Sequence, residues 1–283
     1  MTLLELEKVR FCYPDGSVGL NDCSLTITRG SRNALIGANG SGKTTLFQHA
    51  NGLLHPQSGV VRYAGATLDY RRAGLHALRS KVGLVFQNPD HQLFSASVLE
   101  DVSFGPINLG LDETTVRQRV ASALTAVGMT DCAGKAVHNL SFGQKKRVCI
   151  AGVLAMEPEL LILDEPMAGL DHAMRGDLLA VLDHLHEQGI TLLLATHDLD
   201  FAYRWADRIH VMIDGRCGAS LPCHELEKNH EALNEAGLPL PTVMTLHRQL
   251  VIQGTLPNQA SPRSHAELLT RLESRMSGKE MAC

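Results

Sequence analysis

Residues 33–46 read NALIGANGSGKTTL, and this stretch decides how the rest of the chain is expected to fold. Residues 34–36 are apolar and predict a buried strand, and residues 43–46 open a helix. The glycines between them carry no Cβ, so backbone N–H groups there can turn inward around an anion. The amino end of the helix offers unpaired N–H groups and the positive end of its dipole to the same anion. The stretch therefore predicts a phosphate-binding loop.

The end of this loop predicts how a nucleotide would be held. Lys43 would reach the terminal phosphates as a flexible point charge, and the Thr44 hydroxyl would ligate Mg²⁺. The alternative is a glycine-rich turn before a chance lysine, a pattern that arises in about one chain in a hundred of this length. The nucleotide-binding residues expected in the loop are Gly37, Ala38, Asn39, Gly40, Ser41, Gly42, Lys43, Thr44 and Thr45.

Composition limits the functions open to this chain. Of its 283 residues, 44% are hydrophobic, enough for the core of one large domain with a smaller appendage. The net charge of −4 leaves no basic surplus, so we expect no nucleic-acid partner. No apolar run approaches the roughly 20 residues of a membrane span, and the first residues do not resemble a secretory signal, so an intracellular chain is expected. Seven cysteines without a C-x-x-C pair argue against a disulfide framework or a zinc site.

Three short segments alternate between apolar and polar residues: 4–13, 23–28 and 60–63. This alternation predicts a small antiparallel layer beside the phosphate-binding loop. Tyr13 precedes a Pro-Asp-Gly turn, where its ring can either stack on a base or pack on the sheet. The residues alone leave both interpretations open.

Four apolar strands are predicted to end in functional groups. They cover residues 34–36, 81–86, 160–163 and 190–196. The residues that follow them are, in order, the Gly37 loop, Gln87, Asp164 with Glu165, and His197. Strands that are apolar on both faces belong inside a parallel sheet covered by helices, so an α/β fold is expected. Ligands bind at the carboxyl ends of such strands, and one sheet edge should therefore gather these groups.

The chemistry expected at this edge is phosphoryl transfer from ATP, which needs positioning and charge neutralisation more than covalent help. Thr44, Gln87 and Asp164 are the expected contacts of Mg²⁺ or its water shell. Glu165 is placed to accept a proton from the attacking water, and His197 to contact the γ-phosphate. The alternative for the two acids is a capped turn before Pro166. The expected catalytic residues are Lys43, Glu165 and His197.

Two helices are predicted at residues 112–127 and 140–158, the first capped by Asp112. Ser141 and Gly143 stand at the start of the second helix, which makes its amino end a second possible anion site. This segment could cover the far side of the γ-phosphate from a second copy of the chain. Two copies facing head to tail would then enclose each ATP, which predicts a homodimer.

Residues 88–111 show no long regular period. The apolar residues that no regular face accounts for are Leu93, Phe94, Val98, Phe104 and Ile107. The stretch is either an exposed docking surface or an irregular, self-packed loop, and the two interpretations are equally supported.

The motifs together resemble those of the ATP-binding-cassette (ABC) ATPases over roughly residues 1–220. They are GANGSGKT (37–44), Gln87, LSFGQ (140–144), LLILDEP (160–166), AGLD (168–171) and His197. The resemblance implies a P-loop NTPase domain of the ABC type that uses ATP and Mg²⁺. It also implies an antiparallel β layer and a helical subdomain at about residues 88–158.

The same resemblance implies roles for individual residues. Tyr13 would stack on adenine, and Gln87 would couple the site to a partner. The segment of Ser141, Gly143 and Gln144 would contact the nucleotide held by a second copy, and Asp171 would lie at the dimer interface. Phe142 departs from the family pattern, which commonly has glycine there.

More narrowly, three segments look like the ATPases of energy-coupling-factor importers, most like the CbiO-type cobalt-transport proteins. They are QNPDHQLF (87–94), FGPINLGL (104–111) and QKKRVCIAGVLAMEP (144–158). This likeness implies a peripheral protein on the cytoplasmic face of the cell membrane, working with a transmembrane scaffold subunit and a membrane substrate-capture subunit. Cobalt rests on the likeness alone. Import of nickel or a vitamin, or a soluble ABC ATPase without a transport role, are the alternatives.

Residues 221–283 are expected to form a small helical appendage after the ATPase domain. The sequence LPLP at 238–241 breaks the chain, and Ser264 to Glu267 reads as a capping box. A helical stripe is predicted from Val243, Leu246, Leu250 and Val251. The appendage either reinforces the dimer or packs as a tail on its own domain.

Overall fold

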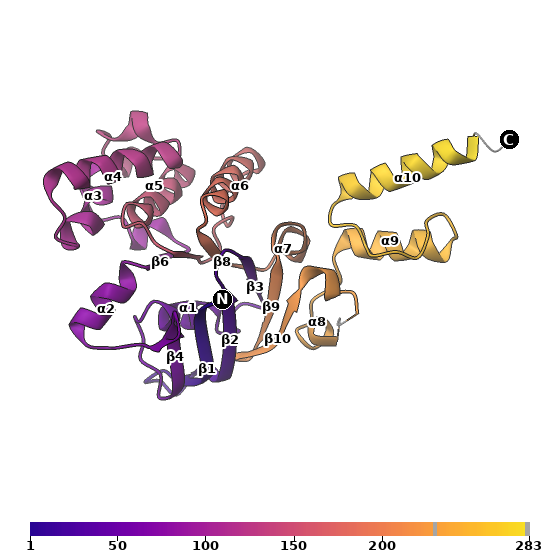
Figure 1. Cartoon of the computed structure of the whole chain (residues 1–283), viewed down its shortest axis with the longest axis horizontal. Coiled ribbons are helices and arrows are strands. Elements are labelled where there is room, and N and C mark those ends of the chain that lie inside the picture. The colour runs from indigo at the N-terminus through magenta and orange to yellow at the C-terminus, as the bar shows by residue number, and fades with distance from the viewer. Residues whose placement is uncertain (229–230, 281–283) are drawn as a thin grey trace.

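The computed structural model describes residues 1–228 and 231–280, and the chain builds two sheets with helices around them (Figure 1). The antiparallel sheet has the order β2-β1-β4-β5. Its strands are β1 (Thr2–Cys12), β2 (Val18–Thr28), β4 (Ser58–Tyr63) and β5 (Ala66–Thr67). The predicted antiparallel layer is therefore confirmed.

The second sheet carries the predicted parallel strands, in the order β10-β9-β3-β8-β7-β6. Its strands are β3 (Arg32–Ile36), β6 (Val82–Val85), β7 (Leu160–Leu163), β8 (Thr191–Thr196), β9 (Arg208–Ile213) and β10 (Arg216–Pro222). β3 pairs in parallel with β8 and β9, and β7 lies between β6 and β8 in the same direction. The carboxyl ends of β3, β6, β7 and β8 consequently meet at one sheet edge.

Two apolar cores lie on the two faces of this parallel sheet. Along β3, Ala34 and Ile36 belong to one core and Leu35 belongs to the other. Leu193 of β8 points to the same side as Leu35, toward a core that also contains Phe47 of α1 (Lys43–Ala50). Because successive side chains of a strand point to opposite faces, strands that are apolar throughout hold both layers together.

The helical part of the chain lies above the antiparallel sheet in Figure 1, around α3, α4 and α5. The helices of the first 205 residues beyond α1 are α2 (Arg72–Arg79), α3 (Val98–Asn108), α4 (Glu113–Ala126), α5 (Phe142–Leu154), α6 (His172–Glu187) and α7 (Leu199–Trp205). Short 3-10 turns lie at Pro89–His91, Thr130–Cys132, Val137–Asn139 and Cys223–Glu225. The predicted helix cap of Asp112 is present, and Ser141 also caps its helix.

The irregular interpretation of residues 88–111 is corrected by α3. Ser97 and Glu100 form a capping box at its amino end, which starts a helix in spite of the internal Gly105 and Pro106. Val98 is fully buried in the core, whereas Phe94, Phe104 and Ile107 stay exposed. Val98 is therefore part of the core, whereas a docking role for the exposed residues stays a prediction.

The chain ends in α8 (Glu231–Glu235), α9 (Thr242–Ile252) and α10 (His265–Glu280), and Figure 1 shows α9 and α10 projecting beyond the sheets. The predicted stripe of α9 is wrong in one position. Leu246 is 45% exposed, and His247 is only 2% exposed in its place, because the helix face toward the core runs through Val243, Met244 and His247. Among the described residues, no helix has the length and apolar character that a membrane span requires.

The capping box predicted at residues 264–267 is half present. Ser264 Oγ accepts a hydrogen bond from the Glu267 N–H at 3.1 Å. The Glu267 carboxylate accepts from the Arg263 N–H at 2.8 Å instead of reaching back to Ser264. The six cysteines of the described residues are free thiols, and Cys283 lies outside the described part of the chain.

Candidate functional site

Two of the three glycines in the 37–42 loop, Gly37 and Gly42, are required by close packing. A Cβ at Gly37 would lie 2.4 Å from the Met212 carbonyl oxygen, and a Cβ at Gly42 would lie 2.5 Å from that of Gly19. Both distances are shorter than any van der Waals contact, so the loop can follow this path only with glycine at these positions. Ser41 Oγ is buried in the loop without a hydrogen-bond partner. An unpaired buried oxygen is costly, and this one marks a place where a ligand would supply the missing partner.

Lys43 lies inside the loop and not on its surface. Its Nζ donates hydrogen bonds to the carbonyl oxygens of Gly37, at 2.8 Å, and Ala38, at 3.0 Å. Only 7% of the residue is exposed, and this burial lowers the pKa of its amine, against the raising effect of Glu165 and Asp164. The ammonium is thus held beside the loop by weak neutral acceptors. An anion in the loop offers it a stronger, charge-assisted bond.

Asp164 and Thr44 meet between the carboxyl end of β7 and the start of α1. Thr44 Oγ1 donates to Asp164 Oδ2 at 2.6 Å. Burial raises the pKa of the Asp164 carboxyl, while the Thr44 hydrogen bond and the Lys43 charge lower it. A hydroxyl and a carboxylate in contact are oxygen ligands of the kind that Mg²⁺ prefers, so these two residues fit the ion.

Glu165 and His197 form the second contact at the sheet edge. His197 Nδ1 lies 3.0 Å from Glu165 Oε2, and the other oxygen, Oε1, is buried without a partner. Glu165 has φ 46°, in the left-handed region that non-glycine residues rarely adopt, at a cost on the order of 1 kcal/mol. The carboxylate is therefore held in place by its surroundings, and its buried Oε1 lacks a hydrogen-bond donor.

Lys146 is a residue of this site that the sequence motifs do not predict. Its Nζ donates to the carbonyl oxygens of Glu165 at 3.2 Å, Pro166 at 2.8 Å and Ala168 at 2.8 Å. The lysine thereby joins α5 to the strained turn at Glu165. A signal for it exists in the sequence, because Lys146 occupies the buried stripe of α5 together with Gly143, Ile150 and Val153. A lysine on an apolar stripe requires acceptors inside the protein.

The ionisation of Lys146 should appear in the stability of the protein. Burial lowers the pKa of its amine from 10.5 to about 8. Below about pH 8 the Lys146 amine is protonated in both the folded and the unfolded state. Above about pH 8 the folded protein loses this proton while the unfolded protein keeps it. The free energy of unfolding therefore rises with pH until the amine of the unfolded protein also titrates. Relative to Lys146→Met, the free energy of unfolding should rise by up to about 1.4 kcal/mol per pH unit across this window. Urea titrations of both proteins from pH 7 to 10 measure the difference, and parallel curves would contradict the shifted pKa.

Gln87 and Tyr13 are two further residues of the predicted site. Gln87 follows β6 at the same edge, with its side chain exposed. The Tyr13 hydroxyl lies 2.9 Å from Thr45 Oγ1, and its ring meets Phe11 edge on, with centroids 5.0 Å apart. In this structure Tyr13 thus packs on the antiparallel sheet at the start of α1.

The Ser141 segment forms the amino end of α5. Ser141 Oγ accepts from the Gln144 N–H at 3.3 Å, and Gln144 Oε1 accepts from the Ser141 N–H at 3.0 Å, so the two form a capping box. A Cβ at Gly143 would lie 2.9 Å from Met174 Sδ of α6, so a glycine suits the close helix contact. Phe142 is partly exposed and lies against Gly169 and over the Lys146 ammonium. Asp171 caps α6 through the Met174 N–H at 2.8 Å.

The structure brings together five predicted residues: Lys43, Thr44, Asp164, Glu165 and His197. A phosphate loop, a Thr-Asp pair and a Glu-His pair at one sheet edge define a nucleoside triphosphatase. Residues 20–168 match the family model described as ABC transporter. The chain therefore belongs to the ABC transporter ATPases, and ATP hydrolysis is its activity.

Comparison with known proteins narrows the family further. The chain is 45% identical to the energy-coupling factor transporter ATP-binding protein EcfA of Methanosphaera stadtmanae, over 88% of this chain and 90% of the relative. It is 44% identical to the EcfA2 protein of Clostridium perfringens, over 85% of each chain. Within the ABC family it belongs to these energy-coupling-factor ATP-binding proteins.

Solved structures agree with this placement. CbiO1 from Clostridium perfringens, part of the ABC transporter complex CbiONQ, superimposes with a TM-score of 0.74 and 43% identity over 87% of this chain and 99% of that one. The ATP-binding cassette MJ0796, in a dimeric post-hydrolysis state bound to ADP and Pi, gives a TM-score of 0.71 and 27% identity, over 78% of this chain and 99% of that one.

Proposed function

We propose that this chain is the ATP-hydrolysing subunit of an energy-coupling-factor importer for cobalt ions, working as a nucleotide-bridged homodimer on a transmembrane partner. The observation that carries the ATPase part is the contact set of Lys43, Thr44–Asp164 and Glu165–His197 at one sheet edge. The import role is supported by the similarity to energy-coupling-factor proteins, and cobalt by the likeness to the CbiO type.

Different residues of the sheet edge bind different parts of MgATP. The loop backbone and Lys43 bind the β- and γ-phosphates, with the Lys43 ammonium leaving its two carbonyl acceptors for phosphate oxygens. Thr44 and Asp164, with Gln87, would hold Mg²⁺, which would supply positive charge to neutralise the phosphates. Tyr13 turns toward the base.

The proton of the attacking water goes to Glu165. The unpaired Oε1 of this carboxylate is the acceptor that a water at the γ-phosphate requires. His197 is bonded to the other oxygen, orients the carboxylate, and from its largely exposed position reaches the γ-phosphate. Lys146 keeps the backbone of Glu165 in its strained conformation from α5.

A second copy is proposed to complete the site. The capping box of Ser141 and Gln144 pairs two N–H groups at the amino end of α5, and those of Phe142 and Gly143 have no partner within the helix. That end, with Gly143, would bind the γ-phosphate held by the other copy. The ATP-binding cassette MJ0796, which is dimeric in a post-hydrolysis state bound to ADP and Pi, supports a dimeric state by similarity.

The membrane partner is proposed to dock in a groove between α2 and α3. The groove has a volume of about 790 Å³ and is lined by apolar side chains that include Leu75, Phe86, Phe94 and Phe104. Phe94 and Phe104 meet edge on, with centroids 4.7 Å apart, although they are 65% and 51% exposed. An exposed aromatic pair on a concave wall suits an amphipathic helix from the transmembrane scaffold.

Replacing Phe94 and Phe104 together by aspartate should abolish cargo uptake while ATP hydrolysis by the isolated chain is retained. Two buried charges at a docked helix would each cost on the order of several kcal/mol, whereas the catalytic residues are untouched. The measurement is uptake of radiolabelled Co²⁺ into vesicles that hold the complex with its membrane subunits. The variant Phe94→Leu/Phe104→Leu keeps an apolar groove and serves as the control.

Three outcomes would contradict the proposal. Unchanged uptake by the aspartate variant would refute the docking groove. Uptake of nickel or a vitamin in place of cobalt would refute the cargo. Failure of the chain to co-purify with any membrane subunit would favour a soluble ABC ATPase.

A further inference from the structure

The helix α7 directly follows His197, so its placement fixes that of the histidine. Asp198 caps α7 by accepting the Phe201 N–H at 2.9 Å, and the Asp198 N–H donates to Thr196 Oγ1 at 3.1 Å. Only one residue, Asp198, separates the histidine from the first residue of the helix. Any force that moves α7 therefore moves His197 against Glu165.

The C-terminal segment holds α7 at its first turn. Asp200 Oδ1 accepts the Thr242 N–H at 2.6 Å, and Asp200 Oδ2 accepts the Thr242 hydroxyl at 2.8 Å. Thr242 is the first residue of α9, whose own N-cap, Pro241, provides no side-chain bond. The carboxylate of α7 thus caps a helix of the appendage, where its negative charge is favoured by the helix dipole.

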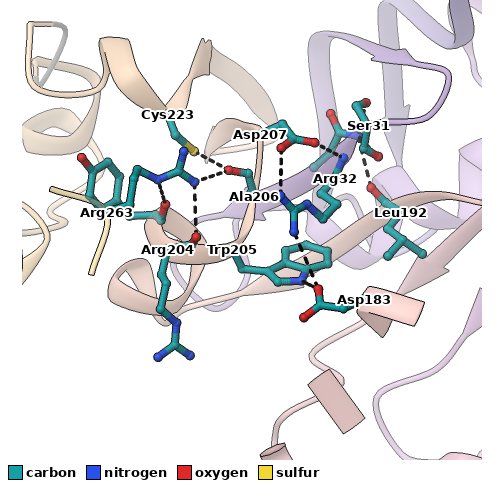
Figure 2. A network of polar contacts seen from close by, with 12 residues as sticks. Ser31, Arg32, Asp183, Leu192, Arg204, Trp205, Ala206, Asp207, Cys223 and Arg263 are labelled. Carbon is teal, nitrogen blue, oxygen red and sulfur yellow. Dashed lines mark hydrogen bonds and ion pairs between the residues drawn. The ribbon is translucent and has the colours of Figure 1, made fainter. Parts of the chain in front are cut away.

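The same segment holds α7 at its last turn (Figure 2). Arg263 Nε donates to the Tyr203 carbonyl oxygen at 2.7 Å, and Nη2 donates to those of Ala206 and Arg204 at 2.5 and 3.4 Å. The last carbonyls of a helix have no partner within the helix, and a guanidinium there also meets the negative end of the dipole. The guanidinium lies over the Tyr203 ring, whose hydroxyl donates to the Ser261 carbonyl oxygen at 3.2 Å.

The end of α7 is also tied to the catalytic domain, as Figure 2 shows. Trp205 Nε1 donates to Asp183 of α6 at 2.9 Å, and Asp207 Oδ2 accepts the backbone N–H of Arg32 at the start of β3 at 2.8 Å. Arg263 therefore acts on the junction where α6, α7 and β3 meet. A cleft of about 420 Å³ between His197 and residues 238–246 places the rest of the appendage beside the histidine.

We propose that residues 238–263 of the appendage position α7, and through it His197, for ATP hydrolysis, with Arg263 and Thr242 as positioning residues. This inference rests on the role proposed above for His197. It assigns the appendage an influence on turnover within its own chain, separate from any part in dimer contacts. A change in the appendage would then be transmitted to the site through α7.

The test is a double-mutant cycle on ATP hydrolysis by the full chain. Arg263→Met should lower kcat by about tenfold, the effect of losing charged hydrogen bonds, with the affinity for MgATP little changed. In a His197→Ala background, Arg263→Met should have no further effect on kcat, because both changes act through the same histidine. Arg271→Met removes an appendage arginine that bonds to Ala260 and Glu267 and not to α7, and it should keep wild-type turnover.

The outcomes separate this inference from the proposed function. If His197→Ala retains full turnover, the proposed role of His197 is wrong. If His197→Ala lowers kcat to a measurable residual rate but Arg263→Met keeps wild-type kcat, the appendage does not position α7. Arg263→Met could lower kcat equally in the wild-type and His197→Ala backgrounds, or Arg271→Met could lower kcat as much as Arg263→Met does. Either result would assign the effect to general destabilisation and contradict the inference. Thr242→Val, which removes only the hydroxyl bond to Asp200, provides a milder second variant that should lower kcat in the same direction.

Discussion

A Glu165→Gln variant is expected to bind ATP and Mg²⁺ with nearly wild-type affinity, to hydrolyse ATP at least a hundredfold more slowly, and to accumulate as a dimer. Glutamine keeps the size of the side chain and the contact with His197 Nδ1. It cannot accept a proton as a carboxylate does, and a positioned general base contributes about 10²- to 10⁴-fold to rate. Because the bridging ATP is then hydrolysed only slowly, the proposed dimer should persist throughout the experiment.

Steady-state phosphate release and light scattering in the presence of ATP or ADP measure the two effects of Glu165→Gln. Glu187→Gln, the same change at an exposed residue of α6, controls for altered charge. A variant that stays monomeric in ATP would count against the nucleotide-bridged dimer. One that retains wild-type turnover would remove Glu165 from the proton transfer.

The sequence predicts which residues meet at the sheet edge because each strand, and the polar residues that follow it, can be recognised from the local sequence. An apolar run fixes each strand, and polar residues that follow it must lie at the carboxyl edge of a parallel sheet. Thr44 and Asp164 are 120 residues apart along the chain, yet the order of strands brings them to 2.6 Å. The same logic pairs Glu165 with His197.

What the sequence does not predict depends on contacts between distant segments. The three carbonyl acceptors of Lys146 come together only when the turn after Glu165 is folded. The sequence of α5 therefore does not identify which groups accept these hydrogen bonds. The contacts of Arg263 are equally hard to predict. Its acceptors are backbone carbonyl oxygens at the end of α7, and every residue type carries such an oxygen. The sequence does not predict helix α3 for a different reason. Gly105 and Pro106 lower its helix propensity, and the capping box together with tertiary packing outweighs them.

Lys43→Ala is expected to lower ATP hydrolysis by about a thousandfold or more and to weaken ATP binding. The amine is the buried cation of the loop, and its removal leaves phosphate charge without its partner and the Gly37 and Ala38 carbonyls without a donor. Transition-state electrostatics of this kind contribute several kcal/mol per group, about 10²- to 10³-fold in rate for one donor alone. The loss of ground-state binding adds to that effect at limiting ATP.

The two causes of the Lys43 effect can be separated by size and charge. Lys43→Arg keeps the positive charge, but its wider guanidinium does not fit between two carbonyl oxygens at 2.8 and 3.0 Å, so it should recover binding better than turnover. Calorimetric ATP titration and the phosphate release rate, measured on variants whose thermal unfolding matches the wild type, distinguish the two. Full hydrolysis by Lys43→Ala would refute the phosphate-binding role of the loop, since no neutral side chain can replace a buried ammonium at a triphosphate.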